Sequence, residues 1–164
     1  MIHSFDSQLQ VSLRALEEVV APALGNAEKH VVEQLMLSIM TIGFVKTRLP
    51  EARRFYRMEL RSCIDLASEA SRIAGATAVL ADAIRAGESD LADPEADVAE
   101  FEAASRNLRD GVTALSHASV GQPWQVKLEG AILERSYALL AQHRKWCAPF
   151  GFELQPESLP PAAW

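Results

Sequence analysis

The stretch from residue 26 to residue 49 constrains the fold most, because it is apolar on nearly every side of the helix that it is predicted to form. Asn26 is a favourable residue at a helix start, and Pro50 follows the stretch. Its large apolar residues are Val31, Val32, Leu35, Met36, Leu37, Ile39, Met40, Ile42, Phe44 and Val45. A helix that is apolar all round is either central in its own domain or covered by a partner.

Four further segments have the spacing of apolar residues that is typical of a helix. We predict these helices over about 6–20, 50–86, 93–119 and 123–147. The first is capped by Ser4 or Asp6, the second ends at Gly87, and the third begins with Asp93 as the cap. The short turns between them indicate an all-α fold, an antiparallel helical bundle of four to five helices over residues 1–148.

Two points of this bundle stay open at the level of sequence. Pro50 either kinks one continuous helix or separates two helices. The predicted helix 50–86 is long for a small domain, so a break near Gly75 is an alternative to one uninterrupted helix. Its core stripe holds Leu66, Ala70, Ile73, Thr77, Leu80 and Ile84.

The last segment, 149–164, holds four of the eight prolines and cannot form a long helix. It also contains Phe150, Phe152 and Trp164, whereas disordered tails usually lack aromatic residues. We therefore expect an extended C-terminal tail that packs on the bundle or on a partner.

Charge and composition narrow the classes of partner. The 164-residue chain has a net charge of −6, whereas nucleic acids and anionic membranes attract proteins with excess positive charge. The longest apolar stretch is interrupted by Glu33 and falls short of the ~20 residues that cross a bilayer. The N-terminus lacks the pattern of a signal peptide, and Cys63 and Cys147 have no ligand spacing. We expect a cytoplasmic protein with no membrane and no nucleic-acid partner.

The residue patterns of known metal, cofactor and catalytic sites are absent from the sequence. Diiron bundles use Glu-x-x-His pairs, and none of His30, His117 and His143 has a glutamate three residues before it. The sequence also lacks glycine-rich phosphate loops and a G-x-S-x-G elbow. We predict no metal, no cofactor and no catalytic residue, and an enzyme with a site of another kind stays an open alternative.

A stripe of arginines is the clearest charge feature. Arg53, Arg57 and Arg61 recur every four residues and share one helix face, where paired donors suit a phosphate or a carboxylate. The alternative is a solvated face, or pairing with the acidic segment 88–102, which has seven acidic residues and no basic one.

Glu59 lies at a second candidate position. Extending the spacing of Leu66 and Ile73 backwards by seven residues places Glu59 on the core stripe, where an unpaired carboxylate is costly and marks a candidate site. The favoured alternative shifts the stripe to Phe55, Met58 and Ser62, which leaves Glu59 exposed.

The segment LRALEEVVAPALGNAEKHVVEQLMLSIMTIGFVKTRLPEARRF, which lies within about the first third of the chain, is similar to small bacterial all-α proteins of unknown function. The resemblance implies a helical domain and carries over no active-site residue.

The apolar helix, the aromatic tail and the opposed charge blocks together favour a protein that acts by protein–protein interaction, as a homo-oligomer (a dimer) or an accessory subunit. The alternative function is binding of an apolar or acyl-type anionic small molecule within the bundle. Met36, Met40 and Phe44 would line that pocket, and Arg53, Arg57 and Arg61 would hold the anionic head group.

Overall fold

The computed structural model describes residues 4–25, 27–75 and 78–164. Within these ranges every regular element is a helix, so the predicted all-α fold is confirmed, and no helix is long and apolar enough to cross a membrane. The chain divides into two compact units. The hairpin unit comprises Met1–Pro50 with Trp146–Ser158, and the bundle unit comprises Glu51–Lys145 with Leu159–Trp164.

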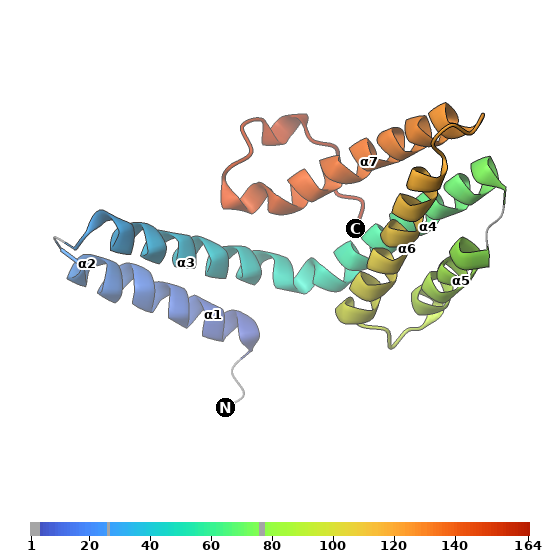
Figure 1. Cartoon of the computed structure of the whole chain (residues 1–164). Helices are drawn as coiled ribbons and strands as arrows, with labels where there is room; N and C mark the ends of the chain where they lie inside the picture. The colour runs from blue at the N-terminus through green and yellow to red at the C-terminus, as the bar shows by residue number, and fades with distance from the viewer. Residues whose placement is uncertain (1–3, 26, 76–77) are drawn as a thin grey trace. The chain divides into compact units, whose positions relative to one another are not determined.

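The hairpin unit is built on two helical arms that lie side by side (Figure 1). The first arm runs through α1 (Phe5–Arg14), the π-helical turn η1 (Ala15–Val20) and α2 (Ala21–Ala23), and the second arm is α3 (Lys29–Arg48). Ser4 caps α1 as expected, because its hydroxyl accepts a hydrogen bond from the amide of Ser7 at 3.2 Å. In η1 the amide of Ala21 donates to the carbonyl of Leu16, five residues back.

Aromatic packing holds the chain after α7 (Gln125–Cys147) against the C-terminal end of α3. Phe44 stacks on Phe150 of the 3-10 turn η3 (Ala148–Phe150), with ring centroids 4.3 Å apart, and meets Trp146 edge-on. Arg48 Nε donates to the carbonyl of Trp146 at 2.8 Å. An ion pair joins the two arms, because Lys46 of α3 lies 3.3 Å from Asp6 of α1.

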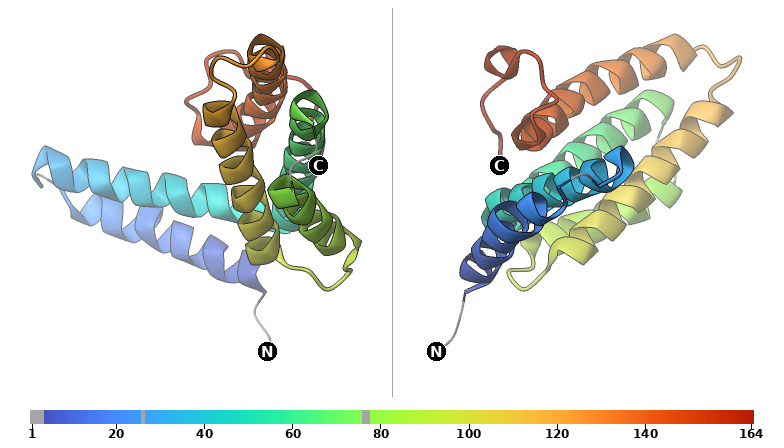
Figure 2. Two further views of the ribbon diagram at one scale, coloured as in Figure 1. Left: turned by 45° about the vertical axis from the view of Figure 1, so that its right-hand side comes forward. Right: turned by 90° about the vertical axis from the view of Figure 1, so that its left-hand side faces the viewer.

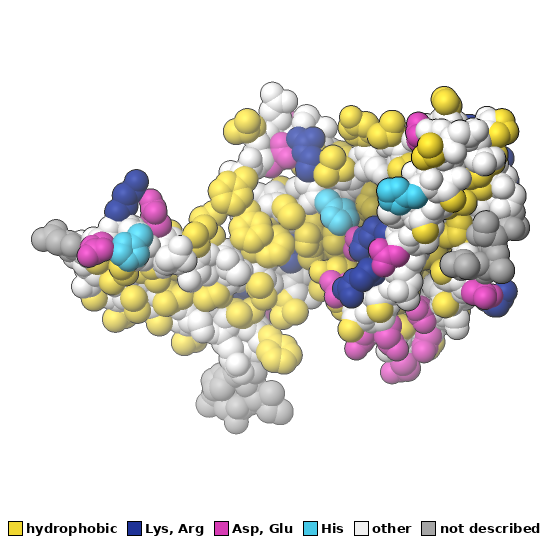
Figure 3. Space-filling model, in the orientation of Figure 1, with side chains coloured by type: hydrophobic (Ala, Val, Ile, Leu, Met, Phe, Trp, Pro, Cys, Tyr) yellow, Lys and Arg dark blue, Asp and Glu magenta, His cyan; other side chains and the backbone are white. Residues whose placement is uncertain are grey.

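The hairpin unit has almost no core of its own. Leu13 is the one buried residue among its described residues, and none of the residues of α3 is buried. Large apolar side chains that are more than a third exposed lie along both arms: Val11, Val19, Val20, Val31, Met36, Leu37 and Val45. Figure 3 shows hydrophobic side chains spread along this hairpin, with charged ones near its tip.

The bundle unit has the core that the hairpin lacks. Helices α4 (Ala52–Ala74), α5 (Ala78–Ala92) and α6 (Val98–Ala118) pack pairwise, and both views of Figure 2 show them grouped together. A 3-10 turn, η2 (Leu49–Glu51), contains Pro50 and lies between the end of α3 and the start of α4. Pro50 therefore separates two α-helices and does not lie inside one. Fully or almost fully buried side chains at the centre are Leu60, Leu80, Phe101, Leu108 and Leu128.

The predicted helix end at Gly87 is wrong. The helix breaks at Gly75, which has a φ of 81°, and α5 then continues through Gly87 to Ala92. Gly87 serves packing instead, because a Cβ there would lie 3.2 Å from Ile64 Cδ1 and 3.3 Å from Leu60 Cδ1. The absence of a side chain lets α5 approach α4 closely.

The predicted start of the next helix at Asp93 is also wrong. Asp97 caps α6 in a reciprocal box, accepting from the amides of Ala99 and Glu100 while the Glu100 carboxylate accepts from the Asp97 amide at 2.7 Å. Asp93 instead accepts from the amide of Glu95 within the loop. The predicted cap Asn26 and the core position Thr77 lie outside the described residues.

The last residues of the chain lie on α7 and α4 within the bundle unit, beyond the 3-10 turn η4 (Pro156–Ser158). Gln142 donates to the carbonyl of Pro161 and accepts from the amide of Ala163 at 3.0 Å. The Trp164 indole donates to Glu51, and its ring meets Phe55 edge-on at 5.3 Å.

Candidate functional site

Glu59 is a buried carboxylate in the middle of α4. It is 5% exposed and lies among the buried residues Phe55, Leu60 and Cys63 of the same helix. The sequence alternative that left Glu59 exposed is therefore wrong, because the helix turns both Phe55 and Glu59 inward. A buried carboxylate at this position needs partners, since burial disfavours its charged form.

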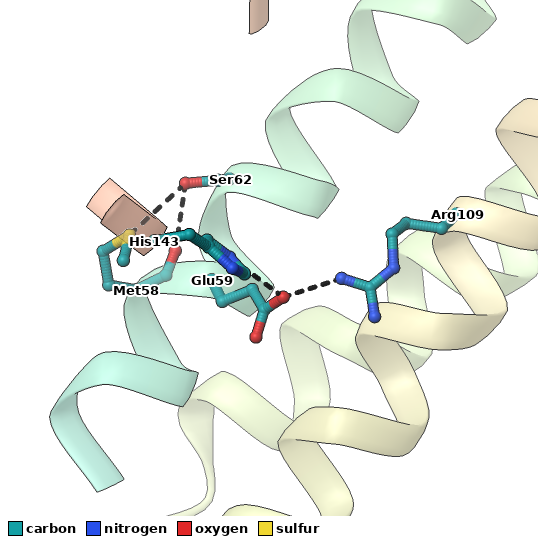
Figure 4. A network of polar contacts seen from close by, with 5 residues as sticks. All are labelled: Met58, Glu59, Ser62, Arg109 and His143. Carbon is teal, nitrogen blue, oxygen red and sulfur yellow. Dashed lines mark hydrogen bonds and ion pairs between the residues drawn. The ribbon is translucent and has the colours of Figure 1, made fainter. Parts of the chain in front are cut away.

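Two cationic or ionisable side chains from different helices meet Glu59 (Figure 4). Arg109 of α6 donates from Nη1 to Glu59 Oε1 at 2.7 Å, a short charge-assisted hydrogen bond. His143 of α7 places Nε2 at 3.4 Å from the same oxygen, an ion-pair distance when the imidazole is protonated. The His143 ring also meets Phe55 edge-on at 5.3 Å. Glu59 thus links the three helices that carry these side chains.

The partners outweigh burial and keep Glu59 ionised. Burial alone raises the pKa of Glu59. The contacts with His143 and Arg109 lower this pKa by more than burial raises it, so the net pKa lies below the ordinary value of 4.5. Burial also disfavours the charged form of Arg109 and by itself lowers the pKa of that side chain. The contact with Glu59 more than compensates, so the net pKa of Arg109 is raised. At neutral pH the pair is therefore a carboxylate and a guanidinium.

Neighbouring groups are held in their neutral forms. Burial raises the pKa of the Cys63 thiol, and the nearby Arg109 guanidinium offsets this only in part. Burial, followed by the negative charge of Glu102, raises the pKa of Tyr56. A protonated, buried thiol is a poor nucleophile, so this cluster favours binding and positioning over nucleophilic chemistry.

A cavity of about 460 Å³ adjoins this cluster within the bundle unit. Its wall includes Cys63 of α4, Arg109 of α6 and residues of α7. Arg135 of α7 also lines it and is held by Glu69 of α4, with Nε 3.0 Å from Oε2. The cavity is therefore bordered by two arginines that are each fixed by a carboxylate of α4.

The arginine stripe is divided by the structure. Arg53 donates to the backbone carbonyls of Pro94 at 2.8 Å and Ala96 at 3.1 Å, inside the acidic segment 88–102. Arg57 and Arg61 form no hydrogen bond or ion pair with another residue that the structure describes. Arg53 thus follows the self-pairing alternative, although its acceptors are carbonyls and not carboxylates.

The other predicted pocket residues lie elsewhere. Met36 is 45% exposed, Met40 is half-buried, and Phe44 packs on Phe150. All three belong to the hairpin unit, whereas the arginine stripe belongs to the bundle unit. Within the described part of the chain, no three residues among His, Cys, Asp and Glu are grouped so that they could hold a metal ion.

The sequence offered Glu59 as a candidate but favoured an exposed position for it, and it gave Arg109, His143 and Arg135 no role beside Glu59. The one available signal was that Arg109 directly follows Leu108, an apolar residue of the predicted helix 93–119. Comparison of the chain with protein-family models, with curated proteins and with solved structures gave no match.

Proposed function

We propose that the chain acts by protein–protein interaction, as a homo-oligomer in which the α1–α3 hairpin is the contact surface. The observation that carries this proposal is that α3 has no buried residue although its middle is almost entirely apolar. Full burial of one large apolar side chain stabilises by about 1.5–3 kcal/mol. Side chains that are about half exposed, such as Met36 and Leu37, would gain a substantial part of that free energy when a partner buries them.

A second copy of the chain suits this surface better than a charged partner. Residues 34–45 of α3 include no charged side chain. Pairing α3 with α3 of another copy therefore buries apolar area without stripping water from an unpaired charge. Gly43 adds room for close approach, because a Cβ built there meets nothing within 4 Å. An accessory subunit of a hetero-complex is the alternative partner class.

The test is the mass of the protein in solution over a range of concentrations, by light scattering and native mass spectrometry. We expect a dimer that dissociates on dilution, and we expect Leu37→Glu to be monomeric. Val126→Glu is the matched control, because Val126 is an exposed apolar residue of α7 in the bundle unit. It should remain dimeric.

A monomeric wild type at every concentration would contradict the proposal. So would a dimer that survives Leu37→Glu, or one that is broken by Val126→Glu alone, because either result places the interface outside the hairpin. Circular dichroism of each variant establishes that helix content is retained, as expected for substitutions at exposed positions.

A further inference from the structure

The cavity of the bundle unit has the dimensions and the lining of a small-molecule site. Its volume of about 460 Å³ lies within the range of roughly 300–1,000 Å³ that ligand pockets occupy. Its walls come from α4, α6 and α7, with Ala163 of the tail at one side. It is independent of the hairpin surface, because all of its lining residues belong to the bundle unit.

The wall of the cavity is largely apolar. Leu66 of α4, Val112 of α6, and Ile132 and Leu139 of α7 contribute side chains to it. Such a surface suits a hydrocarbon chain or a ring, since burying apolar area is favourable and needs no directional partner. Ser136 and Ala138 of α7 are exposed and also line the cavity, so the mouth of the cavity lies at the surface of the bundle unit beside α7.

Two arginines and one aspartate are the charged side chains on the wall. Arg109 and Arg135 line the cavity, against one lining carboxylate, Asp65. Each arginine has one nitrogen committed to a carboxylate outside the lining, Nη1 of Arg109 to Glu59 and Nε of Arg135 to Glu69. A guanidinium has five N–H donors, so each retains donors for a second acceptor. The two ion pairs fix the arginines in place before a ligand arrives.

We propose that this cavity binds an amphipathic small anion, with an apolar chain against Leu66, Ile132 and Leu139 and a carboxylate or phosphate head at Arg109 and Arg135. The ligand class is the one that the sequence suggested, but the site and its arginines are different from those predicted. The two head groups share the same recognition chemistry, because both accept paired hydrogen bonds from a guanidinium.

The experiment is isothermal titration of the full chain with three probes of one chain length: decanoate, decyl phosphate and decanol. We expect saturable 1:1 binding of decanoate, decyl phosphate or both, and weaker binding of decanol, which lacks the charge. The preferred anion identifies the head group. Equal affinity for decanol and both anions, or no saturable binding of any probe, overturns the proposal.

A pair of matched variants tests the role of Arg135. Arg135 and Arg72 both pair with Glu69, at 3.0 and 3.7 Å, but Arg72 does not line the cavity. We expect Arg135→Gln to weaken binding of the preferred anion by about fivefold and leave decanol unchanged, as for loss of one partly exposed charge contact. Arg72→Gln should bind as the wild type does. Equal effects of the two variants contradict the assignment.

Two measurements locate the binding within the chain. Ala138→Trp fills the mouth of the cavity and should abolish binding, and circular dichroism checks that it folds. Without any substitution, alkylation followed by peptide mapping compares Cys63, which lines the cavity, with Cys147, which is exposed and lies in the hairpin unit. The bound anion should slow alkylation of Cys63 alone. Alkylation is continued until the buried Cys63 of the free protein has reacted, and equal slowing of both cysteines, or of neither, then overturns the proposed location.

Discussion

Replacing Arg109 with methionine tests whether Glu59 is held as a buried ion pair. The substitution keeps much of the aliphatic stem but removes the 2.7 Å hydrogen bond to Glu59 Oε1. The Glu59 side chain is 7% exposed and that of Arg109 is 47% exposed. Arg109→Met therefore leaves a buried carboxylate without its guanidinium partner. The reverse substitution, Glu59→Gln, leaves a guanidinium without its carboxylate partner, but water already reaches that guanidinium.

The two costs should differ accordingly. Breaking a buried ion pair from one side costs about 3–5 kcal/mol, and we expect about 2–3 kcal/mol for Arg109→Met because His143 remains beside the carboxylate. Glu59→Gln should cost about 1 kcal/mol, the net value of one hydrogen bond. The double variant should lose less than the sum of the two single losses. Urea unfolding followed by circular dichroism at pH 7 measures all four proteins.

The dependence on pH provides the second half of the test. The pKa of Glu59 in the folded chain lies below 4.5, so the stability that its charge contributes is present above that pH and is lost as the pH falls through the folded pKa. Acidification should therefore narrow the gap between wild type and Arg109→Met, because a protonated Glu59 no longer needs the guanidinium. Equal losses for Arg109→Met and Glu59→Gln, with no change in either below pH 4.5, would refute the ion-pair interpretation.

Three further predictions follow from the helix contacts. Gly111→Ala should destabilise the bundle unit by about 1 kcal/mol, because a Cβ there would lie 2.9 Å from Leu80 Cδ2. Gly130→Ala is the matched control, since a Cβ there meets open space and should stabilise the helix by about 0.5–1 kcal/mol. Thermal unfolding compares the two variants. Asp97→Ala removes the cap of α6 and should cost about 1 kcal/mol in the same assay, whereas an unchanged stability would contradict the role of the cap. Gly43→Ala should stabilise helix α3 by about 0.5–1 kcal/mol yet weaken the proposed dimer. Thermal unfolding measures the stability of the helix, and light scattering measures dimer formation. A variant with both a more stable helix and a tighter dimer would contradict a contact at Gly43.

The helices themselves were largely predictable from periodicity, but the meaning of single residues within them was not. Gly75 and Gly87 lie twelve residues apart, and the sequence offers no difference between them. The first has a positive φ and ends α4, whereas the second is helical and leaves no free space for a Cβ beside Ile64 and Leu60 of another helix. The packing of α5 on α4 depends on contacts between residues far apart in sequence. Only this packing distinguishes a glycine that ends a helix from one that lets two helices approach closely.

The candidate site was predictable at one residue for a similar reason. Glu59 interrupts an apolar repeat on its own helix, and local spacing detects that interruption. Its partners are 50 and 84 residues away, since they are Arg109 and His143, and each lies on a helix whose rotation relative to α4 is set by the whole core. A buried acid predicts that a base lies near it, but not which of the 16 lysines and arginines it is.

Apolar character has opposite consequences in the two units, and this difference connects the sequence to the proposed functions. In α6, Phe101, Leu108 and Val112 lie on one face, and their own chain buries them. In α3, apolar residues lie on all faces, and the first arm together with the turn η3 leaves none of them buried. Periodicity thus indicates not only that a segment is helical but how many neighbours it requires. A helix that requires more neighbours than its unit supplies is the physical basis for placing self-association in the hairpin, and a bundle that is already complete is free to use its remaining cavity for a ligand.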